Sequence, residues 1–111
     1  PTTWLLAGTH FDAIVANNDE MAIGAAMALQ QAGKAKGEIA IVGIDGLPDG
    51  LAAIKRGMLV ASVFQDPKAQ ATAALQAALK MIKGEPVETD VWVPFQLIKP
   101  EQVAVFEQHY K

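Results

Sequence analysis

The 111-residue sequence contains no cysteine. Its absence excludes a disulfide framework, a thiolate metal site and a cysteine nucleophile. A chain without cysteine is compatible both with the cytoplasm and with a bacterial envelope compartment. The cysteine count therefore excludes several kinds of chemistry but leaves the cellular location open.

The sequence also lacks a basic run and a long apolar run. Its formal net charge is −3, and no cluster of lysine and arginine offers a surface for phosphates, which argues against a nucleic-acid partner. No apolar stretch approaches the roughly 18–20 residues that cross a bilayer. The first residues, PTTWLLAGTH, lack the three sections of a secretory signal and resemble the last turn of a helix whose beginning is absent.

The composition is that of a globular chain, because 51% of residues are apolar and only 19% are charged. A chain of this length forms one compact domain, so we assign residues 1–111 to a single, partial domain. We find no internal repeat, low-complexity tract or flexible linker.

Apolar runs and turn residues alternate along the chain in a regular order. Extended segments are predicted at residues 13–16, 39–44, 58–64 and 91–98, and helices at 18–33, 48–57, 66–83 and 100–110. The first long helix is expected to bury Met21, Ala25, Ala28, Leu29 and Ala32. Strand and helix alternate three times with short connections. The pattern therefore predicts an α/β fold, an open and mainly parallel sheet with helices on both faces.

Polar side chains follow three of the predicted strands. Asn17 and Asn18 follow the first strand, Asp45 the second and Gln65 the third. In open α/β sheets, ligands bind beyond the carboxyl ends of the strands. Amides donate and accept hydrogen bonds, and an ionised carboxylate accepts through two oxygens, a mixture that suits the neighbouring hydroxyls of a sugar or cyclitol. These four residues are therefore the candidate substrate-binding residues.

Each of these residues also has a purely structural interpretation. An asparagine at a helix start is often only a cap, and Asp-Gly is an ordinary turn sequence. The stretch IVGIDGLPDG places Asp45 between Gly43 and Gly46, glycines that we expect to let a ligand or another backbone come close. It lacks the glycine spacing and the basic residues of a phosphate site. Only the occurrence of three such residues at successive strand ends favours binding.

Three ordered motifs carry a resemblance to a known family. VANNDEMAIGAAMALQQAGK, IAIVGIDGLPDG and AIKRGMLVASVFQDP resemble the C-terminal half of type I periplasmic sugar-binding proteins. These are the ribose-, galactose- and inositol-like substrate-binding components of ABC transporters, and the resemblance covers residues 11–98. It implies that Asn18, Asp45 and Gln65 contact sugar hydroxyls; Asn17 is a further candidate, at a place that is Gln in some relatives.

The resemblance also implies a partner set and a location. The chain would bind a monosaccharide or cyclitol, perform no covalent chemistry, use no cofactor or metal, and present its load to a membrane ABC permease. It would act in the periplasm, or as a lipid-anchored extracellular protein in a Gram-positive source.

A second function class shares this fold. Lactose-repressor-type transcription regulators use a similar effector-binding domain with an NDxxAxG helix and a VxGxD strand. After that strand the regulators usually carry a PxLTTV segment, where this chain has GMLVASVFQDP. The difference favours transport, and an effector-binding domain remains the alternative.

The resemblance further implies that a whole N-terminal lobe is missing. In the family, the chain crosses to the other lobe after the ASVFQ strand, so the helix in residues 66–84 is expected to pack on that lobe. Its face of Ala71, Leu75, Ala78, Leu79 and Ile82 would otherwise be exposed. We therefore predict that the isolated chain forms a homodimer or swaps elements.

Several other residues are interpreted as structural. Neither histidine has a metal-ligating partner at suitable spacing, and Ser62 lacks a nucleophile motif. Trp4, Trp92 and Phe95 are interpreted as packing residues and not as platforms that stack on a sugar. Phe64, next to Gln65, is the aromatic side chain that could lie near the site. Gly24, inside a helix, suggests close packing against the sheet.

Overall fold

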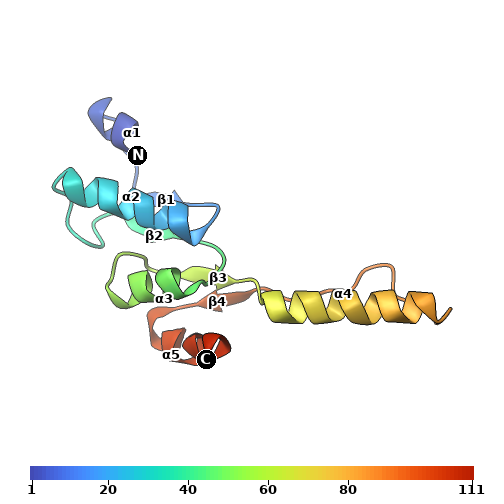
Figure 1. The fold of residues 1–111 in the computed structure, drawn as a ribbon. Helices are drawn as coiled ribbons and strands as arrows, with labels where there is room; N and C mark the ends of the chain where they lie inside the picture. The colour runs from blue at the N-terminus through green and yellow to red at the C-terminus, as the bar shows by residue number, and fades with distance from the viewer.

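A computed structural model describes residues 1–111, and its elements follow the predicted order (Figure 1). The helices are α1 (Thr2–Leu6), α2 (Asp19–Gln31), α3 (Pro48–Lys55), α4 (Pro67–Ile82) and α5 (Val103–Phe106). The strands are β1 (Ala13–Val15), β2 (Ala40–Val42), β3 (Ser62–Phe64) and β4 (Gln96–Ile98). Two short 3-10 helices, η1 (Pro100–Gln102) and η2 (Glu107–Tyr110), flank α5.

The strands lie in the order β1, β2, β3, β4. β1 pairs in parallel with β2, with Ile14 opposite Ile41, and a parallel bridge between Val42 and Ala61 continues the pairing toward β3. β4 pairs with β3 in the antiparallel sense, with Val63 opposite Leu97. The prediction of an α/β fold with an open, mainly parallel sheet is confirmed.

Each of the longer helices begins at a residue suited to that position. The side chain of Asn18 accepts a hydrogen bond from the Met21 N–H and caps α2. Pro48 opens α3, and the Asp66 side chain caps α4 through the Ala69 N–H. These local signals explain why the helix starts were readable from the sequence.

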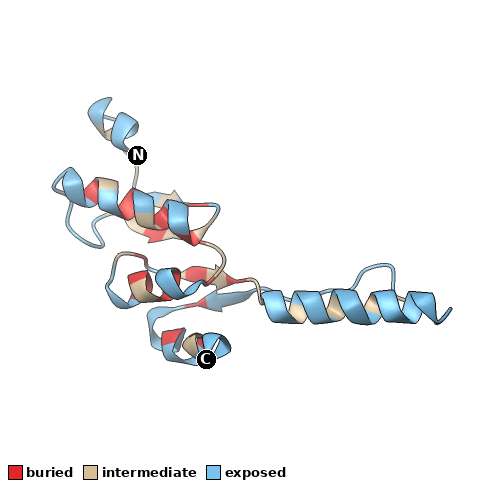
Figure 2. Cartoon of the chain, viewed as in Figure 1, coloured by how far each residue is buried: buried red, intermediate tan, exposed pale blue.

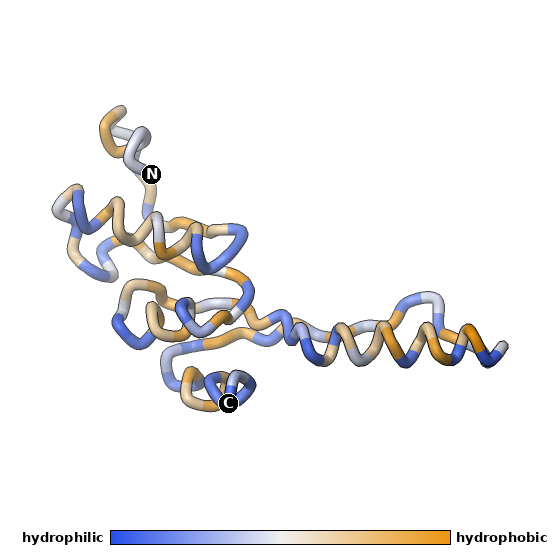
Figure 3. The backbone as a smooth tube through the Cα atoms, in the orientation of Figure 1, coloured by the Kyte–Doolittle hydropathy of each residue, from blue (hydrophilic) through white to orange (hydrophobic).

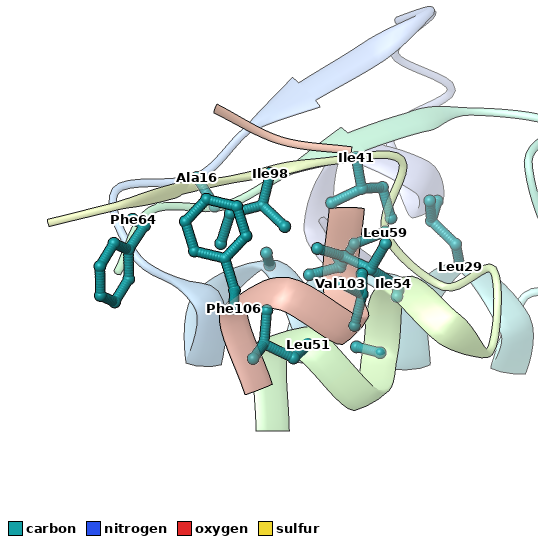
Figure 4. Packing of buried hydrophobic residues seen from close by; sticks show 13 residues of the cluster. Ala16, Leu29, Ile41, Leu51, Ile54, Leu59, Phe64, Ile98, Val103 and Phe106 are labelled. Atoms are coloured by element: carbon teal, nitrogen blue, oxygen red, sulfur yellow. The ribbon is translucent and has the colours of Figure 1, made fainter. Parts of the chain in front are cut away.

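The hydrophobic core lies between α2, α3, α5 and the sheet, as the close view in Figure 4 shows. On α2 the buried residues are Asp19, Ala22, Ala25, Ala26 and Leu29. The prediction is confirmed for Ala25 and Leu29, but Met21 is 58% exposed. Gly24 is exposed with open space around it, so it does not mark close packing.

Helix α4 projects away from the rest of the molecule, and the segment after it runs back along it (Figure 1). No residue of α4 is buried, in contrast to α2 and α3 (Figure 2). Its outer half is rich in apolar residues (Figure 3), among them Leu75, Leu79 and Ile82. The molecule is consequently elongated, with extents of 59 × 30 × 15 Å. None of its helices has the length and apolar character of a membrane span.

Three aromatic residues expected to be packed are exposed. Trp92 is 87% exposed, and Trp4 and Phe95 are each more than half exposed. Trp4 makes one edge-on contact with Phe11. The expectation of packing therefore holds in part for Trp4 and for Phe95, which lines a hollow with Ala73 and Ala77 of α4, but it fails for Trp92.

Candidate binding site

Asp45 and Gln65 are direct neighbours at the edge of the sheet. The Asp45 N–H donates to the Val63 carbonyl oxygen at 2.8 Å, which brings the end of β2 next to the end of β3. The Gln65 Nε2 atom donates to Asp45 Oδ1 at 2.7 Å. Asp45 Oδ2 and Gln65 Oε1 make no hydrogen bond within the chain. The pair therefore presents two unoccupied acceptor atoms.

Asn18 lies at the same edge, on the other side of Asp45. The residue after it, Asp19, accepts a hydrogen bond from the N–H of Gly46, the residue after Asp45. Asn18 Oδ1 caps α2, so its Nδ2 group keeps its two donors free. Asn17 is exposed and makes no side-chain hydrogen bond within the chain. The structure thus gathers Asn18, Asp45 and Gln65, and the cap interpretation of Asn18 holds at the same time.

The backbone of Asp45 is in an unusual conformation. Its φ angle is +117°, in a region that non-glycine residues rarely adopt. Such a conformation costs on the order of 1–3 kcal/mol and persists only where surrounding contacts enforce it. Besides the bond to Val63, the N–H groups of this turn contact one buried residue at the start of α2.

That residue is Asp19, which is only 1% exposed. Its Oδ2 accepts from the N–H groups of Gly46 and Leu47 at 2.9 and 3.1 Å, and its Oδ1 accepts from the Ser62 hydroxyl at 2.5 Å. No buried polar side-chain atom in the chain lacks a partner. Asp19 therefore ties the start of α2 to the turn after β2 and to β3.

Burial raises the pKa of the Asp19 carboxyl above its ordinary value, and the negative charge of Asp45 acts in the same direction. The hydrogen bonds from Ser62, Leu47 and Gly46 oppose this increase because they favour the ionised form. Burial outweighs them.

Two glycines of IVGIDGLPDG, Gly43 and Gly50, lie against the Asp19 side chain. A Cβ atom on Gly43 would overlap Asp19 Oδ1, and a Cβ on Gly50 would lie 2.5 Å from Asp19 Cγ. Gly46 has φ +69°, and a Cβ there would lie 2.7 Å from Ile98 Cδ1. The expectation that these glycines let another backbone come close is confirmed, because a Cβ on Gly43 would lie 3.1 Å from Asp19 Cα and one on Gly46 would lie 3.2 Å from Phe64 Cα.

The C-terminal residues also contact this turn. The Tyr110 hydroxyl donates to the Gly46 carbonyl oxygen at 2.9 Å. Burial raises the pKa of this hydroxyl, and the charges of Asp19, Asp45 and Asp66 raise it further. Phe64 is 1% exposed and packs against Phe106 and His109, so it is a core residue and cannot stack on a ligand.

The chemistry of this edge is that of hydrogen bonding. The Ser62 hydroxyl donates its hydrogen bond to Asp19, and no histidine or lysine contacts Ser62 as a base. No group of three or more His, Cys, Asp or Glu side chains is placed to hold a metal ion. The hollows along α4 and around the loop after α2 are not lined by Asn18, Asp45 or Gln65.

Comparison with known proteins identifies the class. Residues 2–86 match the family model described as a periplasmic binding protein domain. The chain belongs to this family, and the sequence-based identification is confirmed.

Three relatives give the comparison detail. The chain is 49% identical over 106 residues to a protein of Rhizobium meliloti named for rhizopine binding, covering 96% of this chain and 34% of that protein. It is 43% identical over 94 residues to the ribose import binding protein of Salmonella typhimurium, covering 85% and 31%. The crystal structure of an ABC transporter solute binding protein from Bacillus halodurans with bound myo-inositol superposes with a TM-score of 0.89 at 44% identity, covering 98% and 37%.

These relatives are binding proteins and not enzymes, in agreement with the prediction that the chain is not an enzyme. The chain spans about a third of the length of each.

Proposed function

We propose that this chain is part of the substrate-binding component of a bacterial ABC transporter and that it binds a monosaccharide or cyclitol. Asn18, Asp45 and Gln65 are the proposed contacts, with Asn17 as an additional contact at the rim. Two lines of evidence support the proposal. The relatives include a ribose import binding protein and a solute binding protein with bound myo-inositol. The polar groups at the sheet edge have the chemistry that ring hydroxyls require.

The observation that carries the proposal is the hydrogen bond from Gln65 to Asp45. It orients the Gln65 amide so that Oε1 stays available, and it leaves Asp45 Oδ2 available as well. Both atoms accept hydrogen bonds, whereas the free Nδ2 of Asn18 donates. A polyol ring with adjacent hydroxyls can donate to the first two atoms and accept from the third.

The proposed function requires a second lobe in the complete protein. Helix α4, within residues 66–84, has no buried residue in this chain, and we propose that it packs on the N-terminal lobe of the complete protein. Closure of both lobes on the sugar would then present the loaded protein to the membrane permease. The proposed location is the periplasm, or the outer surface as a lipid-anchored protein in a Gram-positive source. None of the three relatives described above is named as a lactose-repressor-type transcription regulator.

Titration calorimetry on the complete polypeptide tests this proposal. Myo-inositol and D-ribose are suitable probes, and Asp45→Ala should weaken binding by about 10- to 100-fold, since a charged hydrogen bond contributes about 1.5–3 kcal/mol. Asp49→Ala is the matched control, because Asp49 is an exposed carboxylate in the first turn of α3 with no side-chain bond. Equal affinity of the Asp45→Ala and Asp49→Ala variants would refute the site.

A further inference from the structure

The backbone on both sides of the Asp45 Cα atom is held in place by other residues. The Asp45 N–H bonds to the Val63 carbonyl oxygen, and the following N–H, that of Gly46, bonds to the Asp19 carboxylate. The rotations about the Cα atom of Asp45 are thereby fixed at a φ of +117°. A side chain leaves the backbone in a direction that these rotations set, so the two anchors determine where the Asp45 carboxylate points.

The next peptide group is held at both ends. Its N–H, from Leu47, donates to Asp19 Oδ2, and its carbonyl, from Gly46, accepts from the Tyr110 hydroxyl. Asp19 reaches the turn from α2 and Tyr110 reaches it from η2, two elements far apart in the sequence. Neither side chain is among the proposed ligand contacts.

Asp19 and Tyr110 are held in different ways. Asp19 is enclosed by Gly43 and Gly50 and is held by the Ser62 hydroxyl, so its carboxylate has no room to turn away. Tyr110 follows His109, whose ring lies 4.8 Å from that of Phe64 in the core. The turn is thus held between a buried acid and the hydroxyl of Tyr110, whose neighbour in η2 packs on the core.

We propose that Asp19 and Tyr110 are positioning residues that hold the turn 45–47 in its strained form and so aim the Asp45 carboxylate at Gln65 and at the ligand. The inference rests on the proposed function for its effect on affinity. The clamp itself is a property of the unliganded chain. Preorganisation of this kind improves binding because the cost of ordering the turn is met during folding and not on association.

Two conservative variants of the complete polypeptide test the clamp. Tyr110→Phe removes only the hydroxyl. Asp19→Asn keeps the shape, and its amide can donate to the Ser62 oxygen, but its neutral oxygen is a weaker acceptor for the two N–H groups. Asp49→Asn is the control for loss of a carboxylate charge.

Hydrogen–deuterium exchange read by mass spectrometry is the first measurement. In Tyr110→Phe and Asp19→Asn, peptides covering residues 44–48 should exchange about 2- to 10-fold faster, as expected for the loss or weakening of a hydrogen bond. Peptides covering 22–29 in α2 should be unchanged, as should all peptides of Asp49→Asn. Unchanged exchange at 44–48 in both variants would overturn the clamp, whether or not the protein binds a polyol.

Affinity for myo-inositol and D-ribose is the second measurement, made in two backgrounds. Tyr110→Phe should weaken binding by about 2- to 10-fold in the wild type but by less than about 2-fold when Asp45→Asn is already present. A purely structural role would give the same loss in both backgrounds, and that result would overturn the positioning role. A wild type that binds neither polyol would contradict the proposed function, and the exchange result would still decide the clamp.

Discussion

Adding one methyl group at Gly50 is expected to destabilise the protein, although alanine is the better helix former. Gly50 and Gly24 both lie inside helices, α3 and α2, so the intrinsic gain from Gly→Ala is about 1 kcal/mol at each. They differ in what the new Cβ atom meets. At Gly24 nothing lies within 4 Å, whereas at Gly50 the new atom lies 2.5 Å from Asp19 Cγ and 3.0 Å from its Cβ.

The magnitude follows from the bonds that Asp19 must give up to move. Overpacking in a tight interior costs about 1–3 kcal/mol. Displacing the carboxylate from Gly46, Leu47 or Ser62 costs about 1.5–3 kcal/mol for the first charged hydrogen bond lost. After subtracting the helix gain, Gly50→Ala should lose about 1.5–5 kcal/mol, while Gly24→Ala should gain about 1 kcal/mol.

Urea unfolding of the complete polypeptide, followed by circular dichroism, measures both variants. Asp19→Ala removes the atoms that clash and should reduce the cost of Gly50→Ala in the double variant, although it is itself destabilising because it leaves buried donors unpaired. Equal stability of Gly50→Ala and Gly24→Ala would refute the reasoning. Strictly additive effects of Asp19→Ala and Gly50→Ala would do the same.

Three further predictions concern Asp19, Asp66 and the exposed face of α4. The pKa of the Asp19 carboxyl is raised above 3.8 in the folded chain, so the folded chain binds the carboxyl proton more tightly than the unfolded chain, and ionisation at higher pH lowers stability. The melting temperature of the wild type relative to Asp19→Asn should therefore fall as pH rises from about 4 to 7. A rise in this difference would contradict the burial argument. Asp66→Ala should lower the free energy of unfolding by about 1 kcal/mol because the hydrogen bond from the Ala69 N–H is lost. Asp66→Asn should keep this cap and the left-handed φ of +42°. Equal melting temperatures of the two variants would exclude a capping role for Asp66. The isolated 111-residue chain should associate in sedimentation experiments at micromolar concentration, because burying each exposed large side chain of α4 stabilises the associated form by about 1.5–3 kcal/mol. The double variant Leu75→Glu, Leu79→Glu should be monomeric. A well-folded wild-type monomer would refute this prediction.

The order and type of the elements were predictable because each has a local cause. Proline opens α3 and α4, an asparagine caps α2, and the apolar runs mark the strands. The strands themselves are shorter than those runs. The run 39–44 contains β2 over only Ala40–Val42, although the N–H groups of Gly43 and Asp45 still bond to the carbonyl oxygens of Ala61 and Val63.

The three strand-end residues were predictable as neighbours because parallel strands bring their carboxyl ends to one edge. Asp19 was missed because an acid at a helix start has an adequate explanation in the helix dipole. A signal was nevertheless present. Asp19 shares the helix face of Ala22, Ala26 and Leu29, at spacings of three, seven and ten residues. A carboxylate in phase with a buried face predicts a buried partner, and choosing Met21 as part of that face concealed it.

The exposure of α4 has a consequence for the dimensions of the molecule in solution. A compact chain of this length has a radius of gyration of about 13 Å, while the extended arm gives 18.0 Å. Small-angle X-ray scattering therefore reports directly on what this helix does. A free arm keeps the scattering curve of a rod attached to a small body, and an arm folded back would bring the curve toward that of a sphere.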